Sequence, residues 1–283
     1  MFEKMEESKS RIITYVVFIL TLAIVILNIV SLIFPALLLT SFATPESRIN
    51  PFELGAWTAP FIVANLAILA FGLLYYMKRF PEIIKRGYKF ILIFEVSRKI
   101  VIVAFVIILG IYIVLTVGEL GIDEGSVWSD WQVVEPIIES FPSGEGNLPL
   151  RVIYVNNFLL YVSQEIFQNV KIIPFLASIA LVFLTYFLTV KISQKRFAGL
   201  VAAVVLLQSH TFLRYDTTAT YANFWTVFYL ASLYMVYKKW PLSPVAFVAS
   251  IFSKALSIAF IPMTLFFVLR SKIQTKERIG LVI

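Results

Sequence analysis

The sequence contains no cysteine, and this absence excludes disulfide bonds, thiolate metal sites and a cysteine nucleophile. It contains one histidine, His210, so a site built from several histidines is excluded as well. Charged residues make up 14% of the chain, whereas soluble domains average about 25%. Hydrophobic residues make up 60% of the 283 residues. Such a composition is typical of a protein embedded in a membrane.

The formal net charge of +7 does not indicate a nucleic-acid partner, because the basic residues lie in short clusters between apolar runs. The densest cluster, Lys78–Lys99, holds seven Lys and Arg side chains between two apolar runs. The positive-inside rule places this cluster, and with it the N-terminus, in the cytoplasm. Within the cluster, Phe90–Phe94 is predicted to form an amphipathic helix lying on the membrane surface, in contact with membrane lipids.

The apolar runs predict an all-α, polytopic protein of the cell membrane with about 6–8 transmembrane helices. Spans are expected near residues 12–40, 57–77, 100–117, 172–190, 197–207 and 221–237. A further run, 241–269, is too long for one helix and is interrupted by Ser253–Lys254, so we expect two short helices hinged there. Residues 1–99 then supply two extra N-terminal helices and the basic loop, and residues 100–283 form the core. The sequence ends in the beginning of another helix, so a C-terminal truncation of this core is expected.

One long polar interval, Gly118–Pro149, stands out in this apolar sequence. It holds seven carboxylates and no Lys or Arg, and it directly follows the third predicted span. Residues 150–169 alternate apolar and amide side chains in a way that predicts a helix lying in the membrane interface. The topology places this loop, 118–170, outside the cytoplasm, on the same side as the polar segment 208–220 and the bend at Ser253–Lys254. Convergence of these segments predicts an extracytoplasmic site.

The order of these features resembles the polyprenyl-phosphate-dependent glycosyltransferases of the GT-C fold. The similarity is closest to the dolichyl-phosphate-mannose–protein mannosyltransferase family, and it covers roughly Gly118–Arg270. The two extra N-terminal spans and the absence of the family's C-terminal spans depart from the family pattern. The residues that carry the resemblance are, in order, Asp123-Glu124, Asn147-Leu148-Pro149, Phe167-Gln168-Asn169, Arg196-Phe197-Ala198-Gly199, Arg214 with Asp216, and Ser253-Lys254 followed by Pro262.

The resemblance implies transfer of a mannose-like hexose from a polyprenyl-phosphate donor to an extracytoplasmic acceptor, a protein or a glycan. Inverting transfer needs a carboxylate base for the acceptor hydroxyl and fixed positive charge for the departing phosphate. The predicted base is Asp123, with Glu124 and Asp130 as further catalytic carboxylates. The predicted phosphate ligands are Arg214 and Lys254, with support from Asp216, Ser253 and His210. No cofactor and no metal ligand are assigned, although the three carboxylates are compatible with a divalent cation.

Each of these residues also has a purely structural interpretation. Asp123 is one of seven acids in a solvated loop, and Arg214 lies close enough in sequence to pair with Asp216. Lys254 can extend to the membrane interface, where His210 and the tryptophans of the acidic loop would also lie. A different class of function therefore stays open, namely a non-catalytic scaffold or an accessory subunit that works with a partner subunit. A transporter is a third alternative, but no internal repeat supports it.

Overall fold

The computed structural model describes residues 2–34, 50, 52–55, 58–77, 81–82, 86–87, 94–141, 154–271 and 273–282. The regular structure of these residues is helical throughout, as predicted. The chain forms two compact units, Met1–Phe94 and Glu95–Ile283. The predicted amphipathic helix at Phe90–Phe94 lies outside the described residues except for Phe94.

The first unit contains two long helices, α1 (Phe2–Ile33) and α3 (Thr58–Tyr76). The end of α1 is tied to the start of α3, because the Thr58 hydroxyl donates a hydrogen bond to the Ile33 carbonyl at 3.1 Å. Helix α1 ends at Ile33, and Phe34, the residue before Pro35, is not helical. A proline disfavours the helical conformation of the residue that precedes it, which accounts for this end. Residues 35–40 of the predicted span lie outside the described residues.

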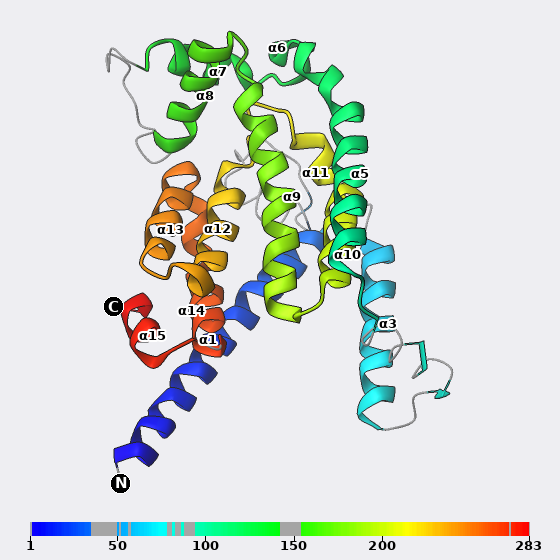
Figure 1. The fold of residues 1–283 in the computed structure, drawn as a ribbon, viewed down its shortest axis with the longest axis vertical. Coiled ribbons are helices and arrows are strands. Elements are labelled where there is room, and N and C mark those ends of the chain that lie inside the picture. Colours follow the sequence, from blue (N-terminus) through cyan, green and yellow to red (C-terminus); the bar gives the residue numbers. More distant parts are fainter. Residues whose placement is uncertain are drawn as a thin grey trace. The chain divides into compact units, whose positions relative to one another are not determined.

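The second unit carries the remaining helices and the predicted site (Figure 1). In chain order these elements are α5 (Arg98–Thr116), η1 (Val117–Gly121), α6 (Glu124–Val127), α7 (Trp131–Glu139), α8 (Tyr154–Phe167), α9 (Ile172–Ser193), α10 (Arg196–Leu207), α11 (His210–Tyr215), α12 (Phe224–Lys238), α13 (Leu242–Ser253), η3 (Ala255–Phe260), α14 (Ile261–Arg270) and α15 (Thr275–Val282).

Two helical segments of the described chain are long and apolar enough to cross a membrane. They are Arg98–Gly121, with 24 residues, and Ile172–Ser193, with 22 residues. At 1.5 Å per residue each measures at least about 33 Å, compared with about 30 Å for the hydrocarbon core of a bilayer. The other apolar helices are shorter, between 10 and 17 residues, so the number of six to eight crossings stays a prediction.

Helix α9 lies at the centre of the second unit and packs against both α10 and α12, while α5 packs against α10. Their shared core includes Tyr112, Phe175, Val182 and Phe212. The opposite face of α5 is apolar but uncovered within this unit, and Leu115 there is 75% exposed. An exposed apolar face of this kind is expected where a helix contacts lipid.

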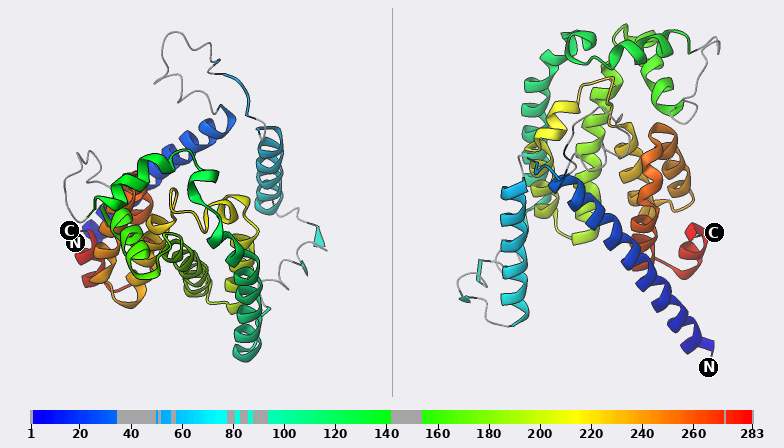
Figure 2. Two further views of the ribbon diagram at one scale, coloured as in Figure 1. Left: turned by 90° about the horizontal axis from the view of Figure 1, so that it is seen from above. Right: turned by 180° about the vertical axis from the view of Figure 1, so that it is seen from behind.

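The acidic loop folds into short helices at one end of the helical bundle. In the views of Figures 1 and 2, α6, α7 and α8 lie across the same end of α5 and α9. Trp131 of α7 and Leu160 of α8 are buried in a second core that also contains Ala177 and Phe224. Helix α8 corresponds to the predicted interfacial helix, and its contact with α9 fixes the loop over the end of the bundle.

The predicted interruption of the last apolar run is confirmed. Helix α13 ends at Ser253, Lys254 has extended backbone angles (φ −157°, ψ 117°), and the 3₁₀ helix η3 begins at Ala255. Two buried serines hold this bend in place. Ser250 donates to the Trp225 carbonyl at 2.7 Å, and Ser257 donates to the Ser250 carbonyl at 3.1 Å. The chain therefore breaks at a hydrogen-bonded joint between two short helices.

The turn between α9 and α10 brings the two helices into close contact at Gly199. Gln194 ends α9 in the left-handed conformation (φ 59°), which reverses the chain within a few residues. A Cβ atom at Gly199 would lie 2.5 Å from Cγ2 of Val190 and 2.8 Å from the ring of Tyr186. Only a residue without a side chain therefore permits this approach.

We expect the substitution Gly199→Ala to destabilise the protein by about 1–3 kcal/mol through overpacking. The measurement is thermal unfolding of the purified protein in detergent. Gly110→Ala is the matched control, because nothing lies within 4 Å of the added Cβ in α5. An equal loss of stability in both variants would contradict the close contact between α9 and α10.

Candidate functional site

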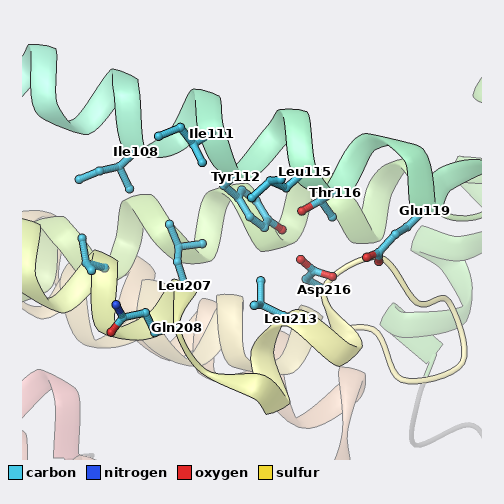
Figure 3. A pocket seen from close by; sticks show the side chains of 11 residues that line it. Ile108, Ile111, Tyr112, Leu115, Thr116, Glu119, Leu207, Gln208, Leu213 and Asp216 are labelled. Carbon is cyan, nitrogen blue, oxygen red and sulfur yellow. The ribbon is translucent and has the colours of Figure 1, made fainter.

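Two adjoining cavities lie where the acidic loop meets the bundle. The first, which we call the apolar cavity, has a volume of about 380 Å³ and follows α5 from Ile108 to Glu119. Figure 3 shows Tyr112, Glu119 and Asp216 together at one end of it, beside the apolar side chains. The second, the polar cavity, has a volume of about 230 Å³, and its lining includes Lys171 and Arg214. Glu119 and Leu213 line both cavities, so the two cavities are neighbours.

A buried ion pair holds the wall of the polar cavity. Nζ of Lys171 lies 3.2 Å from Oε2 of Glu124, and the two side chains are only 7% and 2% exposed. Oε1 of Glu124 accepts a hydrogen bond from the Thr220 amide at 2.8 Å. Lys171 also donates to the Glu119 carbonyl at 3.3 Å. These contacts join three segments at one point, namely the acidic loop, the start of α9 and the segment after α11.

Glu119, at the junction of the cavities, comes from the 3₁₀ helix η1 that follows α5. One of its carboxylate oxygens accepts a hydrogen bond from the Thr217 hydroxyl at 2.9 Å. The side chain is partly exposed, in contrast to Glu124. Glu119 is therefore a carboxylate that is held in place at a position accessible from both cavities.

Asp216 is almost completely buried, with 1% of the residue exposed. Neither of its carboxylate oxygens has a hydrogen-bond partner among the described residues, although the Tyr112 hydroxyl points toward it in Figure 3. Burial raises the pKa of this carboxyl from 3.8 to about 6. The negative charge of Glu119 also raises the pKa, while the hydroxyl of Tyr112 and nearby backbone groups lower it. The Asp216 carboxyl therefore keeps its proton to a higher pH than an exposed aspartate does.

An aromatic cluster borders the polar cavity. The Trp128 ring stacks on Tyr215, with ring centroids 5.3 Å apart, and meets Tyr221 edge-on at 5.1 Å. The guanidinium of Arg214 lies over the Trp128 ring at 5.3 Å. Among the described residues, Arg214 forms no ion pair. Its predicted pairing with Asp216 is thus not observed, and its charge remains accessible in the cavity.

The other predicted carboxylates have structural contacts of their own. Asp123 caps the N-terminus of α6, where its carboxylate accepts a hydrogen bond from the Ser126 amide at 2.8 Å. Asp130 accepts a hydrogen bond from the Tyr221 hydroxyl. Both residues are exposed, and Asp123 is not among the residues described as lining the two cavities. Their catalytic roles stay predictions.

Three further predicted residues lie apart from the cavities. Lys254 is exposed at the joint after α13, with Nζ 5.8 Å from the centroid of the Trp225 ring. Ser253 is buried and donates to the Ala249 carbonyl within α13. His210 is exposed at the first position of α11. None of them belongs to the lining described for either cavity.

The predicted carboxylates do not gather into a metal site in the part of the chain that the structure describes. There, no group of three or more His, Asp or Glu side chains is arranged to hold a metal ion. Asp123, Glu124 and Asp130 instead contact three different partners, namely Ser126, Lys171 and Tyr221.

Several residues of the site were not predicted from the sequence. Lys171 was assigned to no role, yet it is the N-cap residue of α9, the longest of the described helices that follow the acidic loop. A lone lysine at that position was a usable signal, because buried charges in membrane proteins are paired. Glu119 carried no comparable signal, since it is one of seven acids in the loop.

Comparisons of this chain with models of protein families, with curated proteins and with solved structures give no match.

We expect Lys171→Met to destabilise the protein by about 3–5 kcal/mol, because it leaves the buried Glu124 charge without its partner. Thermal unfolding in detergent measures the loss. The double variant Glu124→Gln with Lys171→Met should recover part of it, since no charge then remains buried. Lys239→Met, at an exposed lysine, is the matched control. Equal stability of Lys171→Met and Lys239→Met would contradict a buried ion pair.

The raised pKa of Asp216 predicts a pH-dependent stability. The folded state binds the Asp216 proton more tightly than the unfolded state does, so this contribution is present below pH 3.8 and is lost as the pH rises through about 6. A difference of about two pKa units corresponds to about 3 kcal/mol. Relative to Asp216→Asn, the wild type should therefore lose stability between about pH 4 and pH 6. Thermal unfolding of both proteins from pH 4 to 8 measures this, and a constant difference would contradict it.

Proposed function

We propose that this chain is a membrane glycosyltransferase that moves a hexose from a polyprenyl-phosphate donor to an extracytoplasmic acceptor. The observation that carries the proposal is the junction of an apolar cavity with a polar, aromatic-bordered one at the end of a candidate membrane-spanning helix. A lipid-linked phosphosugar matches these two cavities in polarity, because it consists of an apolar chain, an anionic phosphate and a hydroxyl-rich ring.

The apolar cavity suits the lipid chain of the donor. Ile111 and Leu115 line it, and both are also exposed on the uncovered face of α5. A chain could therefore enter sideways from the membrane without crossing a polar surface. Glu119 and Asp216 lie together at one end of this cavity, and Glu119 also lines the polar cavity. We propose that the polar part of the donor passes this end to reach Arg214 in the polar cavity.

Arg214 suits the phosphate of the donor. Lys171 lines the same cavity, but Glu124 already balances its charge, whereas Arg214 has no carboxylate partner in the described chain. A guanidinium presents a planar set of donors that matches the oxygens of a phosphate. It would stabilise the charge that develops as the phosphate departs. Lys254 remains a predicted second ligand on the basis of the resemblance.

The aromatic border and the threonines suit the sugar. Trp128 lines the polar cavity beside Arg214, where its indole adds an apolar surface against which a sugar ring can pack. The buried Thr218 hydroxyl in the polar cavity has no hydrogen-bond partner among the described residues. An unpartnered buried hydroxyl is costly, and a hydroxyl of the sugar would satisfy it.

The reaction needs a base on the face of the sugar opposite the phosphate. The acceptor oxygen forms a bond to the anomeric carbon, the bond from that carbon to the phosphate oxygen breaks, and its electron pair leaves with the phosphate. A carboxylate takes the acceptor proton. Asp123 is the base that the resemblance implies, and Glu119 is the carboxylate that lines both cavities. These two residues are the candidates for the base.

An accessory subunit without catalysis is the competing proposal, and one observation favours it. Both members of the Asp123-Glu124 pair, which carries the resemblance, have structural partners in this fold. A non-catalytic relative would retain such contacts because they hold the loop together. The two proposals differ in whether the chain transfers sugar.

The test is transfer of a radiolabelled hexose from a polyprenyl-phosphate donor in membranes that contain the full chain. Arg214→Ala should lower the rate about 100-fold or more, as removal of one charge-stabilising donor does elsewhere. Asp123→Asn and Glu119→Gln identify the base by which of them abolishes transfer. Arg270→Ala, at an exposed arginine far along the chain, is the matched control.

An unchanged rate of sugar transfer in Arg214→Ala would contradict the proposed phosphate site. Absence of transfer from a folded wild-type chain with every donor tested would favour the accessory subunit instead. Folding of each variant is checked by size-exclusion chromatography in detergent, so that a misfolded variant is not mistaken for an inactive one.

A further inference from the structure

A third cavity lies at the other end of α5, away from the proposed active site. It has a volume of about 550 Å³ and lies between the first turns of α5 and the last turns of α9. Its walls are apolar, including Val101, Phe105, Phe183 and Phe187. Two arginines, Arg98 and Arg196, are the charged residues of its lining. Neither takes part in the proposed reaction.

The apolar part of this cavity faces the surroundings of the bundle. Ile102, Val106 and Phe187 line it and are each largely exposed. These two helices, α5 and α9, belong to the two described segments that are long and apolar enough to cross a membrane. The cavity is therefore a groove along two candidate spans, with an apolar floor of the right character for an acyl chain.

The two arginines give the groove a specific charge. Arg98 forms no ion pair with another described residue. Arg196 lies near Glu95, but its guanidinium is 3.9 Å from that carboxylate, beyond ordinary hydrogen-bond length, and its side chain is 46% exposed. Glu95 accepts a hydrogen bond from the Arg196 amide instead, at 3.2 Å. The opening of the groove thus keeps a net positive charge.

We infer that this groove binds an anionic phospholipid of the surrounding membrane, with its phosphate between Arg98 and Arg196 and an acyl chain against Phe105 and Phe183. A basic pocket beside an apolar groove between membrane helices is complementary to such a lipid in both charge and shape. A neutral, zwitterionic lipid offers the same chains but carries a compensating positive charge. The site is therefore expected to bind an anionic lipid in preference to a zwitterionic one.

The test uses native mass spectrometry of the full-length protein purified in detergent and titrated with phosphatidylglycerol or phosphatidylcholine. We expect one phosphatidylglycerol per chain at a concentration where little phosphatidylcholine is retained. The double variant Arg98→Gln with Arg196→Gln should weaken phosphatidylglycerol binding by about fivefold for each arginine removed. Glu95→Gln should strengthen it, because it removes the competing carboxylate.

Lys238→Gln with Lys239→Gln is the matched control, since it removes the same charge at residues outside this groove. Val106→Trp provides a second, charge-neutral variant, because an indole at this exposed position would fill the groove and expel the lipid. Size-exclusion chromatography verifies that every variant folds. Equal retention of both lipids, or an equal loss in the control and the arginine variant, would overturn the inference. Phosphatidylglycerol binding that survives Val106→Trp would overturn it as well.

Discussion

The ion pair between Glu124 and Lys171 is the interaction on which the candidate site depends. Charges are expensive to bury, so two opposite charges in an apolar environment hold each other at a fixed separation. Because Glu124 also accepts a hydrogen bond from the Thr220 amide, segments 47 and 96 residues further along the chain meet around one carboxylate. Trp128, Arg214 and the rest of the polar cavity's lining lie close in sequence to these three points of contact. The ion pair and its hydrogen bond therefore fix the segments that build the polar cavity.

Much of the helical framework could be predicted from the sequence, whereas little of the site could. Apolar runs and their interruptions are local properties, so α3, α9 and the break at Lys254 follow directly from the order of residues. The end of α1 before Pro35 is likewise a local property, because proline restricts the residue that precedes it. The roles of the seven acids depend on which ones meet a partner far along the chain. Asp123 and Glu124 are neighbours in sequence, yet one is an exposed helix cap and the other is buried.

The resemblance to the GT-C glycosyltransferases rests on an ordered set of short motifs rather than on any single one. In the fold, the parts of that set are used unequally. Arg214 and Asp216 reach the paired cavities, while Ser253 and Lys254 form a joint between helices. Residues outside the motifs, Glu119 and Lys171, complete the cavities. The motif residues Arg214 and Asp216 therefore coincide with the candidate site, whereas Ser253 and Lys254 do not.

Helix α5 and the 3₁₀ helix η1 that follows it join the proposed lipid groove near Arg98 to the candidate site near Glu119. At 1.5 Å per residue in α5 and 2.0 Å in η1, these positions are about 33 Å apart, close to the thickness of the hydrocarbon core. Headgroups of the two leaflets would then meet the two ends of the same helix at once. Such a helix would register the thickness of its bilayer, since a thicker membrane would tilt it or pull one end away from its lipid. Membrane composition would thereby act on both ends of this helix at once, with no change in the protein itself.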